Sequence, residues 1–228
     1  MGPPKKGCAK LSKLLYNSQL CKMKNINAII FDLGGVILNI NYQKTINEFA
    51  NLNLISEDSY FSKSLQTDLF DQIETGKISA NEFLIEIQKK NTAVSIQQIK
   101  SAWNAMLLNL PQKRIELIKK IRKKFSIYLL SNTNAIHIAE FKRKIGADRY
   151  HEFYNLFDKV YYSHEIGVRK PNAKAFEVIL EENQLAPHEV FFIDDSIQHI
   201  KGAKKLGIKT GYISKNLTLS TFFSDIAL

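Results

Sequence analysis

Residues 27–40, with the sequence NAIIFDLGGVILNI, form the stretch around which the rest of the chain is organised. The apolar run 28–31 is too short for a helix and rich in isoleucine, so it predicts a strand buried on both faces. The run ends at Asp32, and Gly34 and Gly35 let the backbone turn sharply and approach whatever the carboxylate binds. In isolation the pattern is also typical of a hairpin in which Asp is a turn former. The remaining motifs favour a functional carboxylate.

The composition, 45% hydrophobic and 24% charged over 228 residues, is typical of a globular protein with one large domain or one domain plus an insertion. No apolar run approaches the roughly 18–20 residues of a membrane span, so we expect no membrane partner. The first 24 residues hold six lysines and no acid, which leaves +4 of the net charge of +10 for the rest. Because the charge is concentrated in that segment, we expect no nucleic-acid partner.

Residues 1–24 are predicted to be a disordered basic tail. Both cysteines, Cys8 and Cys21, lie in it, so the body has neither a disulfide framework nor a CxxC site. The tail also lacks the apolar core of a signal peptide. These features favour a cytoplasmic protein.

Helical patterning replaces strand patterning from residue 39 to residue 109. Residues 43–54 place apolar side chains at helical spacing, and Ser79 with Glu82 forms a capping box ahead of a second stripe. A third stripe runs from Ile96 to Met106. Because this segment separates two strands, we interpret residues 39–109 as an inserted helical cap subdomain over the strand ends.

After residue 110, strands and helices alternate. Strands are expected at 125–130, 159–162, 190–193 and 208–213, and helices at 112–124, 136–145, 172–182 and 196–206. The many lysines of 112–124 are interpreted as a solvated helix face. Alternation of this kind predicts an α/β fold, a Rossmann-like doubly wound parallel sheet covered on both faces. The core domain would comprise residues 25–38 and 110–228.

Polar residues stand where the predicted strands end, which is the edge at which such sheets bind ligands. They are Asp32, Ser131, Lys170 and the pair Asp194 and Asp195. Carboxylates that meet without a cation repel each other. Mg²⁺ removes this repulsion best, because it accepts one or two carboxylates together with waters and a substrate phosphate. A lysine and a hydroxyl beside the metal complete a site for a phosphoryl group.

Four short segments together resemble the signature motifs of the haloacid-dehalogenase-like (HAD) superfamily, in order and at the right strand ends. They are FDLGG at 31–35, LLSNTN at 129–134, GVRKP at 167–171 and FFIDD at 191–195. The resemblance extends from about residue 26 to 213. It is greatest to sugar-phosphate phosphatases similar to alpha-D-glucose-1-phosphate phosphatase and to the phosphatase domain of soluble epoxide hydrolase. It implies a HAD-like core, a helical cap and a small phosphorylated metabolite as substrate.

The resemblance also implies a role for each motif residue. Asp32 would be the nucleophile that accepts the phosphoryl group as an aspartyl-phosphate. The implied Mg²⁺ ligands are Asp32, Asp195 and the backbone carbonyl of Gly34, with Asp194 as a supporting carboxylate. The implied contacts of the phosphoryl oxygens are Ser131, Asn132 and Lys170.

One position departs from the usual superfamily pattern. Most of these phosphatases have a second aspartate two residues after the nucleophile, as general acid and base, where this chain has Gly34. Metal binding through the backbone carbonyl should survive, but acid–base help worth about 10²- to 10⁴-fold is in doubt. His137 is a candidate to supply it, although we expect a surface or helix-capping histidine.

Two other functions remain as alternatives. A haloacid dehalogenase would use an aspartate nucleophile without metal, but the pair Asp194 and Asp195 would then be a costly concentration of negative charge. A catalytically weak binding or regulatory protein is favoured only by Gly34. The sequence leaves the individual substrate and the oligomeric state open.

Overall fold

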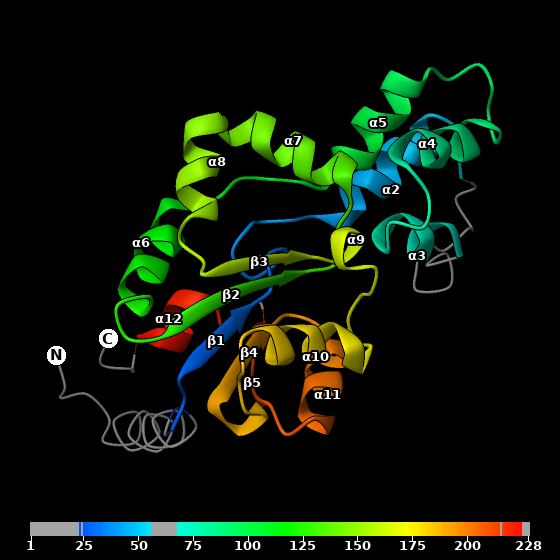
Figure 1. Cartoon of the computed structure of the whole chain (residues 1–228). Helices are drawn as coiled ribbons and strands as arrows, with labels where there is room; N and C mark the ends of the chain where they lie inside the picture. Colours follow the sequence, from blue (N-terminus) through cyan, green and yellow to red (C-terminus); the bar gives the residue numbers. More distant parts are fainter. Residues whose placement is uncertain (1–22, 24, 56–67, 215, 225–228) are drawn as a thin grey trace, which may run out of the picture.

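A five-stranded parallel sheet with the order β3-β2-β1-β4-β5 forms the centre of the molecule (Figure 1). The structure is a computed structural model, which describes residues 23, 25–55, 68–214 and 216–224. The strands are β1 (Ala28–Phe31), β2 (Ser126–Ser131), β3 (Lys159–Tyr162), β4 (Val190–Asp194) and β5 (Lys209–Tyr212). The predicted tail, apart from Met23, lies outside the described residues.

The register of the sheet brings the strand ends to one level. β1 lies between β2 and β4, with Phe31 paired to Leu129 on one side and to Ile193 on the other. The four residues of β1 are fully buried, as their continuous apolar pattern predicts. Residues that follow Phe31, Leu129 and Ile193 therefore lie together at the carboxyl edge.

Helices cover both faces of the sheet (Figure 1). Side chains of β1 alternate, so that Ile29 and Phe31 join one apolar cluster while Ala28 and Ile30 join the other. The first face is covered by α6 (Gln112–Ile121), α7 (Ala135–Ile145), α8 (Ala147–Tyr154) and α12 (Leu219–Phe223). The second face is covered by α10 (Ala173–Glu182) and α11 (Ile197–Lys205). The doubly wound parallel fold is thereby confirmed.

The segment between β1 and β2 folds into helices around an apolar cluster that also includes Ile136 of α7. They are α2 (Tyr42–Asn51), α3 (Asp68–Glu74), α4 (Ala80–Gln88) and α5 (Ile96–Asn104). Trp103 is central to the cluster, with ring-centroid distances of 5.2 Å to Phe70 and 4.9 Å to Phe83. The capping box of Ser79 and Glu82 is present at the start of α4.

The two connections between this helical segment and the sheet meet at Asn39 and Asn109. The backbone N–H of Asn39 donates to the carbonyl of Asn109 at 3.1 Å, and their side chains are joined at 3.0 Å. We keep residues 39–109 as the proposed cap, because this pairing holds the entry and exit of the segment together.

Short elements were the main omissions of the sequence analysis. No helix was predicted at α3, α8, α12, α9 (Ser163–Ile166) or the 3₁₀ turn Pro187–Glu189, and α6 ends at Ile121 rather than at residue 124. These elements have one or two turns, too few for a periodic pattern to stand out. Among the described residues, no helix is long and apolar enough to cross a bilayer.

Candidate active site

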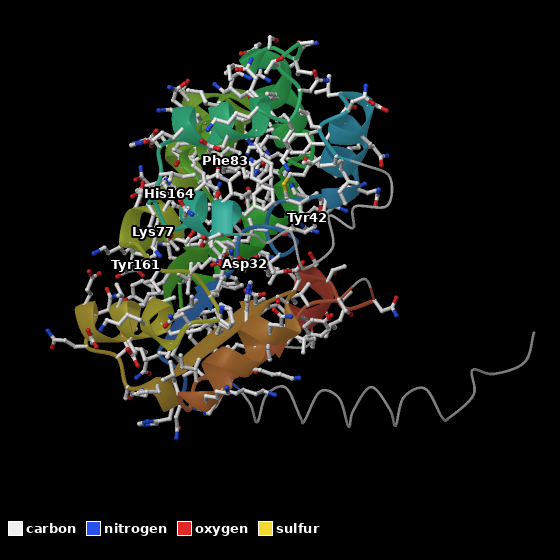
Figure 2. All side chains as sticks on the ribbon, turned by 90° about the vertical axis from the view of Figure 1, so that its right-hand side faces the viewer. Asp32, Tyr42, Lys77, Phe83, Tyr161 and His164 are labelled. Atoms are coloured by element: carbon white, nitrogen blue, oxygen red, sulfur yellow. The ribbon has the colours of Figure 1, made fainter. Side chains whose placement is uncertain are left out.

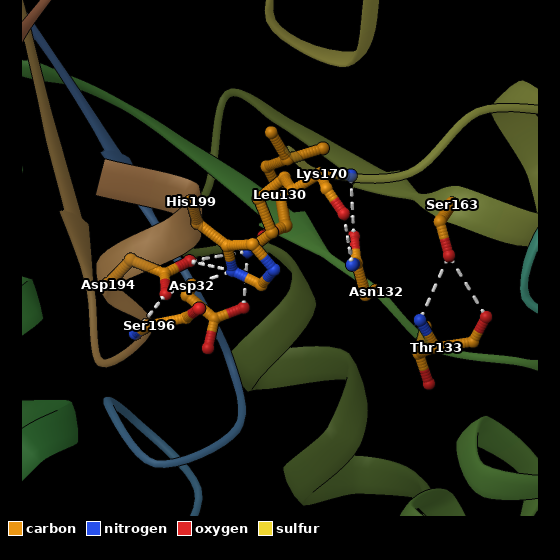
Figure 3. A network of polar contacts seen from close by, with 9 residues as sticks. All are labelled: Asp32, Leu130, Asn132, Thr133, Ser163, Lys170, Asp194, Ser196 and His199. Atoms are coloured by element: carbon orange, nitrogen blue, oxygen red, sulfur yellow. Dashed lines mark hydrogen bonds and ion pairs between the residues drawn. The ribbon is translucent and has the colours of Figure 1, made fainter. Parts of the chain in front are cut away.

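Lys170 is buried at the carboxyl edge of the sheet and joins two carboxylates (Figure 3). Its Nζ donates to Asp32 Oδ1 at 2.6 Å, to Asp194 Oδ2 at 2.7 Å and to the Leu130 carbonyl at 2.8 Å. Burial alone would lower the pKa of Lys170, but the charges of Asp194 and Asp32 outweigh it and raise the pKa above its usual value. The lysine is therefore a fixed cation between the ends of β1 and β4.

Asn132 holds the backbone of Lys170 in place. Its side-chain oxygen accepts from the Lys170 N–H at 2.9 Å, and its Nδ2 donates to the Lys170 carbonyl at 2.9 Å (Figure 3). Both ends of the amide are thus engaged. In this geometry the Asn132 side chain positions Lys170, and a contact of Asn132 with the phosphoryl group stays a prediction.

The loop after β2 is fixed by a second pair of hydrogen bonds. Ser163 Oγ accepts from the Thr133 N–H at 2.9 Å and donates to the Thr133 carbonyl at 3.1 Å. Ser131, the last residue of β2, is buried at the same edge. The structure thus brings Ser131 to the strand ends, as predicted, just before the loop that Ser163 holds.

Asp194 is held by groups from the turn after β4 and from the first turn of α11. Its Oδ1 accepts from the Ser196 N–H at 2.7 Å, and His199 Nδ1 lies 3.0 Å from each carboxylate oxygen. Because a carboxylate only accepts, Nδ1 carries the proton. Burial would raise the pKa of Asp194, but Lys170 and His199 lower it below the usual value.

His199 is the residue that the sequence analysis missed. Burial lowers its pKa, so the ring is neutral near pH 7 and acts as an N–H donor to Asp194. The signal that could have found it is a histidine in the first turn of the helix that follows FFIDD. A ring there is directed back toward the strand end.

Gly35 allows the turn after β1 to pack against Asp195. Its φ is +79°, and a Cβ at this position would lie 2.0 Å from Asp195 Oδ2. Only glycine combines this backbone conformation with so close an approach. Gly34 is different, because a Cβ there would meet only the flexible Ile40 side chain, nearest at 3.1 Å.

Carboxylate oxygens of Asp32, Asp194 and Asp195 lie within 4.8 Å of one another. Burial, together with the neighbouring carboxylates, raises the pKa of Asp32 to about 8 despite the nearby Lys170. Burial and the charge of Asp194 raise the pKa of Asp195 to about 6. The set of hard oxygen donors and their mutual repulsion suit a divalent cation such as Mg²⁺. Asp195, which is exposed, is better placed to bind it than Asp194, whose oxygens already have donors.

His137 does not belong to this cluster of polar groups, and it is neither a surface nor a capping residue. Its ring stacks on Trp103 at 4.9 Å, and Nδ1 lies 2.8 Å from Asn104 Oδ1. The cap of α7 is Asn134, whose side chain accepts from the His137 N–H. His137 thus connects α7 to α5 of the proposed cap, and its side chain is engaged there.

The fold and this cluster identify the class of protein. Residues 26–207 match the family model of haloacid dehalogenase-like hydrolases, and the chain belongs to that family. The expected superfamily is thereby confirmed.

Several relatives with named activities are phosphatases. The D-ribitol-5-phosphate phosphatase of Bacteroides thetaiotaomicron is 30% identical over 186 residues, which cover 81% of this chain and 90% of that protein. The sesquiterpene phosphatase astK of Aspergillus oryzae is 21% identical over 83% of this chain and 91% of its own length. Among solved structures, a HAD family enzyme from B. thetaiotaomicron in complex with magnesium and inorganic phosphate superposes with a TM-score of 0.77. That enzyme is 34% identical, with 87% of this chain and 99% of that chain covered.

Proposed function

We propose that this hydrolase is a Mg²⁺-dependent phosphatase that cleaves the phosphate monoester of a small sugar or alditol. The observation that carries the proposal is the buried Lys170 between Asp32 and Asp194, with Asp195 beside them. One cation and a set of carboxylates suited to a metal thus lie around Asp32, the proposed nucleophile. The relative that acts on D-ribitol 5-phosphate indicates the substrate class.

Asp32 would attack phosphorus through the oxygen that is not paired with Lys170. The P–O bond to the substrate alcohol breaks as the bond to Asp32 forms, and water then hydrolyses the aspartyl-phosphate to free phosphate. Asp32, Asp195 and the Gly34 carbonyl would hold Mg²⁺, which would supply the positive charge that lets two anions approach. Lys170 and Ser131 would stabilise the phosphoryl oxygens during transfer.

The alternatives account less well for the site. A metal-free dehalogenase has no use for Asp195, whose carboxylate oxygen lies within 4.8 Å of those of the nucleophile and Asp194. A binding protein without catalysis would not need a lysine that is fully buried and held by three hydrogen bonds at a nucleophile.

The test is release of inorganic phosphate by the purified protein from a panel of phosphorylated metabolites, with Mg²⁺ and with EDTA. We expect turnover that requires Mg²⁺. Asp32→Asn should lower kcat by at least about a thousandfold, as for other nucleophile substitutions, while the circular dichroism spectrum is retained. Near-normal activity of this variant would disprove covalent catalysis by Asp32, and full activity in EDTA would disprove the role of the metal.

A further inference from the structure

The cap brings one acidic side chain to the edge of the active site. Glu74 ends α3, and its Oε2 lies 3.1 Å from Nη1 of Arg169. Arg169 directly precedes Lys170, whose Nζ is 2.6 Å from Asp32. The side chains of Glu74 and Arg169 are only 21% and 17% exposed. Glu74 is therefore held beside the phosphoryl site by a largely buried ion pair.

The backbone contact that follows α3 fixes this helix against the core. Gly76 has φ +66°, and a Cβ on it would lie 2.2 Å from the His164 carbonyl oxygen in α9. Figure 1 shows α3 close to α9, near the carboxyl ends of the strands. Because the approach is so close, Glu74 has a defined position relative to the sheet.

Tyr42 is the second cap residue near the carboxylates. It begins α2, and its side chain is 64% exposed, although surrounding protein and the charges of Asp32 and Asp195 raise its pKa above the usual value. The charge of Glu74 acts on the same hydroxyl. Figure 2 shows Tyr42 on the cap side of Asp32. Tyr42 thus lies on the cap side of the proposed nucleophile, with its hydroxyl under the influence of the Asp32 and Glu74 charges.

We propose that Glu74 and Tyr42 form the subsite that recognises hydroxyl groups on the leaving alcohol of the substrate. This inference rests on the proposed phosphatase function and specifies its substrate class. In-line displacement places the leaving oxygen opposite the Asp32 oxygen, away from the sheet and toward the cap. A fixed carboxylate accepts hydrogen bonds from a polyol, and the tyrosine hydroxyl can donate or accept.

The same groups disfavour an apolar leaving group. A terpenoid chain placed against Glu74 would remove water from a carboxylate without replacing its hydrogen bonds. The subsite therefore selects a sugar or alditol phosphate over an apolar ester of the kind that the name of the sesquiterpene phosphatase indicates.

Asp71 provides a matched control on the same helix. It lies three residues before Glu74 and also pairs with Arg169, but its side chain is 54% exposed. Asp71→Asn removes the same charge and an ion pair with the same arginine. If these ion pairs only hold the cap against the core, Asp71→Asn and Glu74→Gln should change kcat/KM in the same way.

The experiment compares kcat/KM for D-ribitol 5-phosphate and for 4-nitrophenyl phosphate, which has no hydroxyl group. Loss of a charged hydrogen bond in Glu74→Gln should lower the ratio of the two values by about 10- to 100-fold. Tyr42→Phe should lower it by about 3- to 10-fold. Asp71→Asn should leave the ratio unchanged. Equal losses on both substrates, or the same ratio in Glu74→Gln and Asp71→Asn, would overturn the inference.

A binding measurement separates this inference from the proposed function. If the wild-type protein hydrolyses neither substrate, the phosphatase assignment fails. Calorimetric titration with D-ribitol 5-phosphate in the presence of Mg²⁺ then tests whether Glu74 contributes to binding. Binding that is at least about tenfold weaker in Glu74→Gln than in Asp71→Asn supports it. Absent binding, or equal binding by the two variants, overturns it.

Discussion

At the scale of single residues, the two adjacent glycines after Asp32 have different tasks. Gly35 needs its left-handed backbone and leaves no room for a Cβ beside Asp195, whereas Gly34 has an ordinary backbone and a flexible neighbour, Ile40. Gly34 is also the position at which a general acid is missing. Gly34 therefore bears on the proposed acid–base chemistry, and Gly35 bears on the geometry of the turn that packs against Asp195.

Alanine substitutions at Gly34 and Gly35 should distinguish the roles of the two glycines. We expect Gly35→Ala to lower the free energy of unfolding by at least about 1 kcal/mol, because of backbone strain and the clash with Asp195. It should also weaken Mg²⁺ binding. Gly34→Ala should change the free energy of unfolding by less than about 1 kcal/mol. Urea unfolding and calorimetric Mg²⁺ titration measure both effects, and equal behaviour of the two variants would contradict the interpretation.

Without a proton donor at Gly34, the rate should depend steeply on the acidity of the leaving group. Anomeric sugar phosphates should be cleaved faster than hexose 6-phosphates. The variant Gly34→Asp should raise kcat on poor leaving groups most, by about tenfold or more, because the nearest neighbour of the new side chain can shift. Equal wild-type rates on the 1- and 6-phosphates of one sugar would show that another residue already donates the proton.

At the scale of elements, the contact between α5 and α7 joins cap and core through a buried histidine. Burial lowers the pKa of His137 to about 3, from an ordinary value of 6.5. The folded protein therefore keeps the ring neutral, while the unfolded chain binds a proton below pH 6.5. The stability associated with His137 is present above that pH and is lost as the pH falls toward 3.

Between pH 7 and pH 5, His137 should account for a loss of about 2 kcal/mol in the free energy of unfolding. His137→Phe keeps a ring against Trp103 but does not titrate, so its stability should fall less over this interval. Urea unfolding at both pH values measures the difference. Substitution of the exposed His188 by Phe is the control and should retain the wild-type dependence. The same dependence of stability on pH in the wild type, in His137→Phe and in His188→Phe would rule out His137 as its source.

At the scale of the whole molecule, the proposed cap and the sheet are built around different apolar clusters, each of which includes residues of the other segment, and Met23 packs against the cluster of the sheet. This methionine is partly buried, and its carbonyl accepts from the Ile26 N–H at 3.2 Å. The predicted tail before it contains no motif residue and little apolar patterning. Removal should therefore stop before Met23.

Deletion of residues 1–22 should leave kcat unchanged and the thermal midpoint within about 2 °C of the full chain. Differential scanning calorimetry and the phosphate assay check this. A decrease of several degrees would show that the tail packs on the body.

The sequence by itself determined the alternation of strands and helices, the helical insertion and the four motifs at strand ends. These features depend on local periodicity, caps and turn residues, and on strand order rules that hold for parallel sheets in general. These local features were enough to predict the family, which is confirmed. They were also enough to predict that Asp32, Lys170 and Asp194 meet at one edge of the sheet. Short elements such as α8 could not be predicted from the sequence, because one or two turns show no clear periodicity of apolar residues.

Only the tertiary structure decided which partner each polar side chain has. Asn132 bonds a backbone 38 residues away, and His137 bonds Asn104 across 33 residues. The ion pair of Glu74 with Arg169 likewise joins cap to core. Hydrogen bonds and ion pairs act over a few ångströms, so they depend on which distant segments the packed elements bring together. No local pattern contains that information.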